Sequence, residues 1–241
     1  MRYLTLELRK SRRTGVYVIL PLVGILGALY AFLNFALRRD ALLALPLPPM
    51  TILLTQLYGM IMVLNLFAVT AAACLSYHHE FLGNGLKKMA GLPVSLTGIF
   101  LTKFIFLAVG LALCILIENA ALALIGTHVL PPGTFKLEVL IRFSVTSYLT
   151  TLPLLAFMLT VSSRFETVWM PLGIGVVGFL SGMTMAMAKS ALLTLNPFVL
   201  IMRPAMGTDL LQDPLLITTA AAETIIFFGA GWLLTRYLSY E

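Results

Sequence analysis

The chain has 241 residues, of which 60% are hydrophobic and only 11% are charged, and its net charge is +6. Soluble domains carry about 25% charged residues, so this composition excludes an ordinary soluble protein and indicates an integral membrane protein. The basic residues are scattered along the flanks of apolar runs, which is typical of a topology signal and argues against a nucleic-acid partner.

Residues 1–15 precede the first long apolar run and mix apolar with charged side chains. Tyr3, Leu4, Leu6 and Leu8 lie among basic and acidic residues, which favours an amphipathic helix on the inner leaflet. A disordered basic head is the alternative. The apolar run that follows is too long for a signal peptide and lacks a clear cleavage site, so we expect an uncleaved anchor.

Six apolar segments reach the roughly 20 residues with which a helix crosses a bilayer. They lack the alternation of a β-barrel, and backbone groups in lipid must bond internally. We therefore predict an all-α fold, a single membrane domain over residues 1–241 built as a bundle of six transmembrane helices. The predicted spans are Val16–Leu37, Thr51–Tyr77, Gly98–Ile125, Val139–Ser162, Thr167–Met187 and Leu215–Leu238.

The segment 190–214, between the fifth and sixth spans, is apolar but too short to cross the bilayer. Pro197, Pro204 and Pro214 interrupt it, which favours short re-entrant or interfacial helices on the outer side. In an N-inside layout of six spans, ten Lys and Arg residues fall on the inner side and six on the outer side. The positive-inside rule then predicts that both termini are cytoplasmic.

Two motifs resemble functional sites but have simpler explanations. GIGVVG at 173–178 matches a dinucleotide fingerprint, yet no strand precedes it and it lies inside a predicted span. We predict instead that Gly173, Gly175, Gly178 and Gly182 permit close helix packing. The run at 78–80, two histidines and a glutamate, has no third ligand at a recognisable spacing, so we predict no metal site.

Three polar residues within the predicted spans are candidates for a role inside the membrane. Glu223 lies near the middle of the sixth span, where an ionised carboxylate costs about 2.5–3.5 kcal/mol, so it should face the interior and be paired or protonated. Both a polar pathway and a structural hydrogen bond remain open for it. Glu118 is less informative because it can lie near the outer interface, and Asn65 is expected to bond another helix.

The residues 78–103 form a charged insert between the second and third spans. They contain an acidic residue, two glycines, a basic pair, the sequence LPVS at 92–95 and a final lysine: Glu80, Gly83, Gly85, Lys87, Lys88, Pro93 and Lys103. This segment resembles the cytoplasmic signature of ABC type-2 exporter permeases. Six spans, an amphipathic N-terminal helix and short outer helices match that family's plan, whereas Asn84 and Leu96 depart from the usual pattern.

The resemblance implies that residues 78–103 couple the chain to ABC ATPase subunits. A short helix would dock into a groove of the ATPase, with Lys87 and Lys88 facing acidic rims and Pro93 fixing the turn into the third span. The alternative for this segment is an ordinary solvated loop. The chain has no nucleotide-binding loop of its own, so we expect no catalytic residue and no cofactor here, with ATP and Mg²⁺ on the partner.

The size of the chain and its lack of a large extracellular domain further resemble bacterial permeases that give immunity to lantibiotics or bacitracin-like peptides. That resemblance implies a second permease, identical or homologous, in the bacterial cytoplasmic membrane. The expected substrate is an antimicrobial peptide or another hydrophobic compound expelled from the lipid. The rival function is an ATP-independent secondary carrier or channel that uses Glu223.

Overall fold

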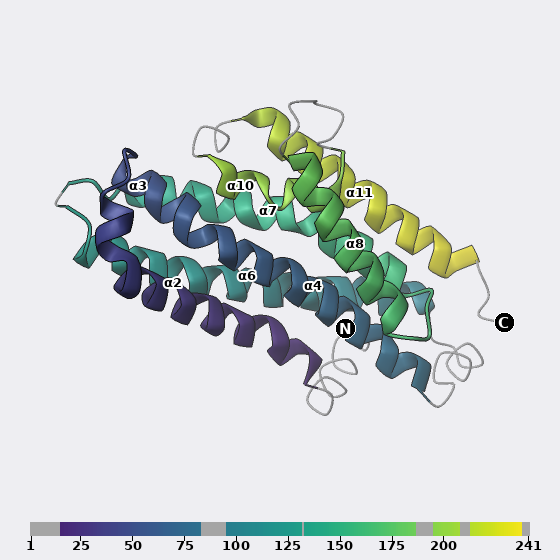
Figure 1. The fold of residues 1–241 in the computed structure, drawn as a ribbon. Coiled ribbons are helices and arrows are strands. Elements are labelled where there is room, and N and C mark those ends of the chain that lie inside the picture. Colours follow the sequence, from purple (N-terminus) through teal and green to yellow (C-terminus); the bar gives the residue numbers. More distant parts are fainter. Residues whose placement is uncertain (1–14, 83–94, 132, 187–194, 208–212, 238–241) are drawn as a thin grey trace.

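The structure, a computed structural model, describes residues 15–82, 95–131, 133–186, 195–207 and 213–237 (Figure 1). Within these ranges every regular element is helical, and six helical segments are long and apolar enough to cross a membrane. The prediction of an all-α, six-span membrane protein is therefore confirmed. The amphipathic helix predicted for residues 1–15 falls almost entirely outside the described residues.

The helical elements follow one another with short connections. In chain order they are η1 (Val16–Val18), α2 (Ile19–Leu43), α3 (Pro49–Ile52), η2 (Leu53–Leu57), α4 (Tyr58–Phe81), α6 (Leu96–His128), α7 (Leu137–Ser162), α8 (Trp169–Ala186), α9 (Pro197–Leu200), α10 (Arg203–Met206) and α11 (Pro214–Tyr237). The elements α3, η2 and α4 together make the second span, in which η2 is a single π-helical turn.

Most observed spans lie within a few residues of the predicted ones, and the first span is the exception. We predicted that it ends at Leu37, but α2 continues to Leu43. The three charged residues at 38–40 are exposed there, so they keep contact with polar surroundings while the backbone remains largely helical. Arg38 has non-helical dihedral angles, which marks a kink in this last part of α2.

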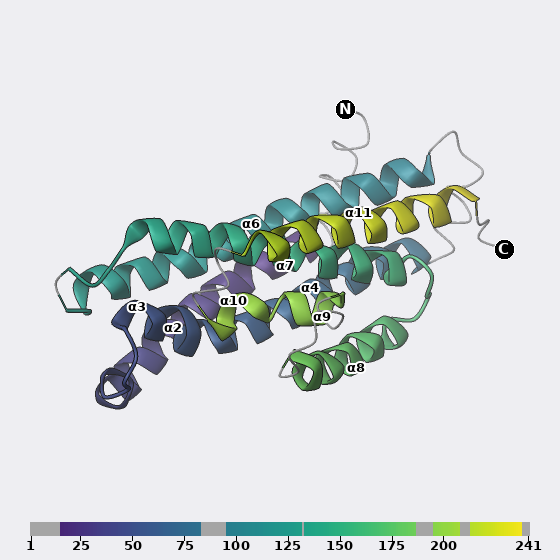
Figure 2. The ribbon, with the colours of Figure 1, turned by 90° about the horizontal axis from the view of Figure 1, so that it is seen from above.

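Three helices form the centre of the bundle and three lie outside it. The most apolar windows of the spans that contain α4, α6 and α7 are 61%, 50% and 56% buried, against 33%, 22% and 22% for α2, α8 and α11. Helix α2 packs on α6 and α4, and α11 packs on α7. Figure 2 shows α8 at the edge of the bundle, where it contacts α4 and α9. The outer helices therefore expose most of their apolar surface.

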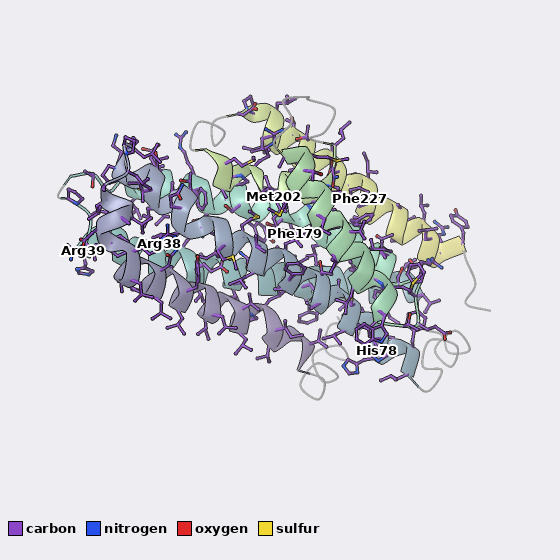
Figure 3. The ribbon with its side chains drawn as sticks, in the orientation of Figure 1. Arg38, Arg39, His78, Phe179, Met202 and Phe227 are labelled. Atoms are coloured by element: carbon purple, nitrogen blue, oxygen red, sulfur yellow. The ribbon has the colours of Figure 1, made fainter. Side chains whose placement is uncertain are left out.

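The bundle has two ends, which we name the Glu80 end and the His128 end. The Glu80 end contains the last turn of α4, the first turns of α6 and α8, and the last turns of α7 and α11. Figure 3 shows Arg38 and Arg39 at the His128 end and His78 at the opposite one. The predicted coupling segment therefore leaves and re-enters the bundle at the Glu80 end.

The short helices predicted before the last span correspond to α9 and α10. Asn196 caps α9 by accepting a hydrogen bond from the Phe198 N–H at 2.9 Å, and Pro197 occupies the first helical position. The residues of α9 are buried, so this segment folds back into the bundle. It contacts α7, α8 and α11.

Candidate functional site

Two residues that flank the predicted coupling segment form an ion pair inside the bundle. Glu80 lies in the last turn of α4 and Lys103 in the third turn of α6, with 3.0 Å between Lys103 Nζ and Glu80 Oε1. Their side chains are only 3% and 4% exposed. Lys103 Nζ also lies 5.6 Å from the centroid of the Tyr77 ring. The pair therefore joins α4 to α6 at the base of the segment.

Burial makes the Glu80–Lys103 pair costly to break. A charge that loses its partner inside a protein also lacks water, and this typically costs about 3–5 kcal/mol. The exposed pair Glu138–Arg142 on α7 provides a contrast, because its side chains are 78% and 57% exposed. Pairs of that kind contribute about 0–1 kcal/mol. Removing one partner of the Glu80–Lys103 pair should therefore cost more stability than removing one partner of the exposed pair.

A second contact fixes the same end of α4. The Nδ1 atom of His78 lies 3.2 Å from the backbone oxygen of Glu166, within hydrogen-bond distance when Nδ1 carries the proton. Glu166 belongs to the connection between α7 and α8. The end of α4 therefore contacts both α6 and the α7–α8 connection.

The remaining residues of the predicted coupling segment lie outside the described residues. These are Gly83, Gly85, Lys87, Lys88 and Pro93, so their docking role stays a prediction. The described part resumes at Ser95, whose Oγ accepts a hydrogen bond from the Gly98 N–H at 3.2 Å. Ser95, the last residue of the LPVS sequence, thus caps α6, which begins at Leu96.

A polar cluster lies in the core where α2, α4 and α6 meet. Asn65 Nδ2 donates a hydrogen bond to Glu118 Oε2 at 2.8 Å. The Cys114 Sγ lies 3.3 Å from Asn65 Oδ1 and 3.5 Å from Glu118 Oε1, so its S–H can donate to either oxygen. Glu118 is fully buried within the bundle. Buried carboxylates need such donors, and these contacts tie α4 to α6 a second time.

Two glycines of α2 make room for this cluster. A Cβ atom at Gly24 would lie 2.9 Å from the backbone Cα and O atoms of Cys114, and one at Gly27 would lie 2.9 Å from Glu118 Oε1. Real Cβ contacts are longer than this. The absence of side chains at both positions therefore lets the α2 backbone lie directly against α6 and the Glu118 side chain.

Glu223 lies on the inward face of α11, apart from the cluster around Glu118. It is 5% exposed, and within the described residues neither of its carboxylate oxygens has a hydrogen-bond partner. One turn further along α11, the Phe227 carbonyl accepts a hydrogen bond from Thr160 Oγ1 at 3.0 Å. The ring of Phe227 stacks against Phe157 of α7. Glu223 is thus a buried carboxyl group against the α7 side of the bundle.

The glycines of α8 differ in what they contact. A Cβ atom at Gly175 would overlap the Thr70 side chain of α4, and Cβ atoms at Gly178 and Gly182 would collide with Phe198 of α9. Gly173 has no atom within 4 Å of its Cβ position. Three of these glycines thus lie at contacts within the chain, and the fourth faces open space.

Sequence reasoning did not identify Gly24, Gly27 or Cys114 as part of the polar cluster. The spacing carried a signal, because Cys114 and Glu118 are four residues apart and so share one face of a helix. The glycines are three residues apart on the first span, which places them on one face as well. The sequence does not show how the first span is aligned along the third, so it could not place these glycines beside Cys114 and Glu118.

The sequence was also compared with models of protein families. The family model described as ABC-2 family transporter protein matches residues 3–182, well over half of the chain. The match includes the cluster around Glu118, both members of the Glu80–Lys103 pair and the whole predicted coupling segment. No curated protein matches the sequence. The chain therefore belongs to the ABC-2 transporter family and is a membrane-spanning permease of that type.

Proposed function

We propose that the chain is the permease subunit of an ATP-driven exporter in a bacterial cytoplasmic membrane. Both termini and the Glu80 end would then face the cytoplasm, as the distribution of Lys and Arg favours. Membership of the ABC-2 family implies an ABC ATPase as partner. ATP and Mg²⁺ would bind to that subunit, and a second permease would complete the transporter.

In this proposal the segment 78–103 receives force from the ATPase. Closure of the ATPase subunits would push on the segment, and the Glu80–Lys103 pair would pass the displacement to α4 and α6 together. The Asn65–Glu118 hydrogen bond joins the same two helices further along. The central helices would then exchange between two packings of similar stability, which nucleotide binding biases.

The observation that carries the proposal is the buried ion pair at the base of the segment. Burying a pair of charges costs desolvation that exposed charges at a helix end avoid, so we infer that this pair serves to join α4 and α6 at the two ends of the segment. Here the pair joins α4 and α6, the two helices that flank the segment. Its charged atoms, Lys103 Nζ and Glu80 Oε1, are 3.0 Å apart. The substrate that fits an apolar bundle of this kind is an amphipathic peptide or another hydrophobic compound.

Charge reversal at Lys87 and Lys88 tests the coupling role. We expect Lys87→Glu with Lys88→Glu to reduce ATP-dependent export about tenfold or more, which corresponds to about 1.4 kcal/mol of lost docking energy. Membrane insertion should remain normal. The measurement is ATP-dependent uptake into inverted vesicles that contain the chain and the ATPase that co-purifies with it.

The matched control reverses the basic pair Arg38 and Arg39, which is exposed at the His128 end of the bundle. Export should survive that change. Wild-type export after reversal of Lys87 and Lys88 would remove the docking role and leave an ordinary solvated loop.

One observation favours the rival function, a carrier driven by an ion gradient. Glu223 is buried without a hydrogen-bond partner among the described residues, as a proton-binding carboxyl group in a membrane can be. Glu223→Gln keeps the shape and removes the charge. For the exporter we expect ATP-dependent transport close to that of the wild type, because no step requires this proton. Loss of transport in a folded Glu223→Gln variant would support the carrier instead.

A further inference from the structure

Helix α8 packs along α4 and runs in the opposite direction. The rings of Phe67 on α4 and Phe179 on α8 lie 5.2 Å apart between their centroids. About one turn closer to the Glu80 end, the α8 backbone at Gly175 lies so near α4 that a Cβ atom there would overlap the Thr70 side chain. Figure 3 shows Phe179 in the middle of the bundle and His78 at its end. The two helices therefore keep contact over several turns.

His78 adds a third contact, a hydrogen bond just before the start of α8. Its acceptor is the backbone oxygen of Glu166, three residues before α8 begins at Trp169. A carbonyl oxygen can only accept, so His78 Nδ1 must carry the proton that it donates across 3.2 Å. The three contacts follow one another along both helices, so the hydrogen bond continues the α4–α8 packing to the Glu80 end.

The last turn of α4 is held from two sides. An α-helix has 3.6 residues per turn, so the side chains of His78 and Glu80 point about 200° apart around the helix axis. Glu80 pairs with Lys103 of α6, whereas His78 contacts the connection that leads into α8. A force that displaces the end of α4 therefore acts on α6 through one side chain and on α8 through the other.

The start of α8 depends on this contact because it is otherwise exposed. Its first two residues, Trp169 and Met170, are 82% and 55% exposed. The two glycines that pack against Phe198 of α9 lie further along the helix. The hydrogen bond from His78 is therefore well placed to make the start of α8 follow the end of α4.

We propose that His78 is a positioning residue that makes α4 and α8 move as one unit. The inference rests on the proposed function, because it extends the path of force from the segment 78–103 through α4 to α8. The connection at Glu166 would follow the end of α4, and the contacts of Gly175 and Phe179 would keep the rest of α8 aligned. Without the hydrogen bond, the start of α8 would lag behind α4.

The first measurement uses the chain alone and needs no ATPase. Spin labels on His79→Cys and Trp169→Cys, both exposed positions, report the distance between the end of α4 and the start of α8. The two native cysteines are buried and free, so they should not take up the label. We expect a narrow distance distribution with His78 present and a broader one with His78→Ala.

Two conservative variants show whether the hydrogen bond itself is responsible. The side-chain N–H of Asn is attached to Cγ, as Nδ1 is in histidine, whereas that of Gln is one bond further from the backbone. His78→Asn should therefore restore the narrow distribution, and His78→Gln should not.

The second measurement uses the complex of the chain with the ATPase that co-purifies with it. His78→Cys with Glu166→Cys replaces the hydrogen bond by two thiols, which a short bis-thiosulfonate reagent joins and a reductant releases. In the reduced form we expect ATP-dependent uptake into inverted vesicles to fall about fivefold, as the loss of one typical hydrogen bond allows. Crosslinking should restore the wild-type rate, because it ties α8 to α4 again.

The matched control is His128→Ala. His128 is also an exposed histidine in the last turn of a long helix, but it lies at the opposite end of the bundle. Its replacement should change neither the spin-label distances nor the rate of uptake.

Three results would overturn the proposal. They are a distance distribution that His78→Ala leaves narrow, wild-type uptake by the reduced double variant, and a folded crosslinked variant that is inactive. The last would show that α4 and α8 must move apart during transport. A wild-type complex without ATP-dependent uptake would contradict the proposed function, and the spin-label distances would then decide alone whether His78 holds the start of α8.

Discussion

Replacement of Lys103 by Met should lower the free energy of unfolding by about 3–5 kcal/mol, because it removes the cation that lies against the buried Glu80 carboxylate. The two charged atoms are 3.0 Å apart and the side chains are almost fully buried, so water cannot replace the lysine. The measurement is thermal unfolding of the purified chain in detergent, together with ATP-dependent export by the complex.

A charge swap distinguishes the effect of losing the ion pair from the effect of changing either residue alone. In the double variant Glu80→Lys with Lys103→Glu the two charges face each other again, and we expect most of the lost stability and export to return. The control removes an exposed pair through Glu138→Gln with Arg142→Met, which should change stability by about 0–1 kcal/mol. A Lys103→Met variant as stable as the wild type would show that the pair imposes no constraint.

The second large effect is expected from Gly24→Leu. A side chain at this position would meet the backbone of Cys114 at 2.9 Å, and a helix backbone cannot rotate away as a side chain can. Helix α2 must then separate from α6, and overpacking of this kind typically costs about 1–3 kcal/mol. Because Cys114 is fully buried in the native chain, its reaction with a maleimide should become faster.

The matched control is Gly229→Leu on α11, where no atom lies within 4 Å of the Cβ position. It should change neither the unfolding temperature nor the reactivity of Cys114. If the Gly24→Leu variant unfolds at the wild-type temperature and its Cys114 stays unreactive, α2 and α6 do not pack as closely as described here.

Much of the fold could be predicted from the sequence because the bilayer fixes the length of apolar helices. The end of the fourth span at Ser162 was predicted to the residue, two positions before Arg164, whereas its start is Leu137 rather than the predicted Val139. Pro197 and Pro204 indicated two short helices, and these are α9 and α10. The continuation of α2 to Leu43 was missed, because the three charged residues at 38–40 suggested an end that the helix does not need.

The contacts within the candidate site were harder to predict. Glu80 and Lys103 were both chosen as coupling residues, but their spacing of 23 residues gives no distance between their side chains. Cys114 carries no signal of its own, because a cysteine in an apolar run is most often a small core residue. Its contact with Asn65 and Glu118 depends on the register of α4 against α6, which is set by packing of whole helices rather than by local pattern.

The most direct test of the central claim is purification of the tagged chain in mild detergent, followed by mass spectrometry of the proteins that co-purify. The account predicts a stoichiometric ABC ATPase subunit, which is lost when Lys87 and Lys88 are replaced by Glu and retained when Arg38 and Arg39 are replaced. A chain that purifies without an ATPase and moves solute in the absence of ATP would contradict it.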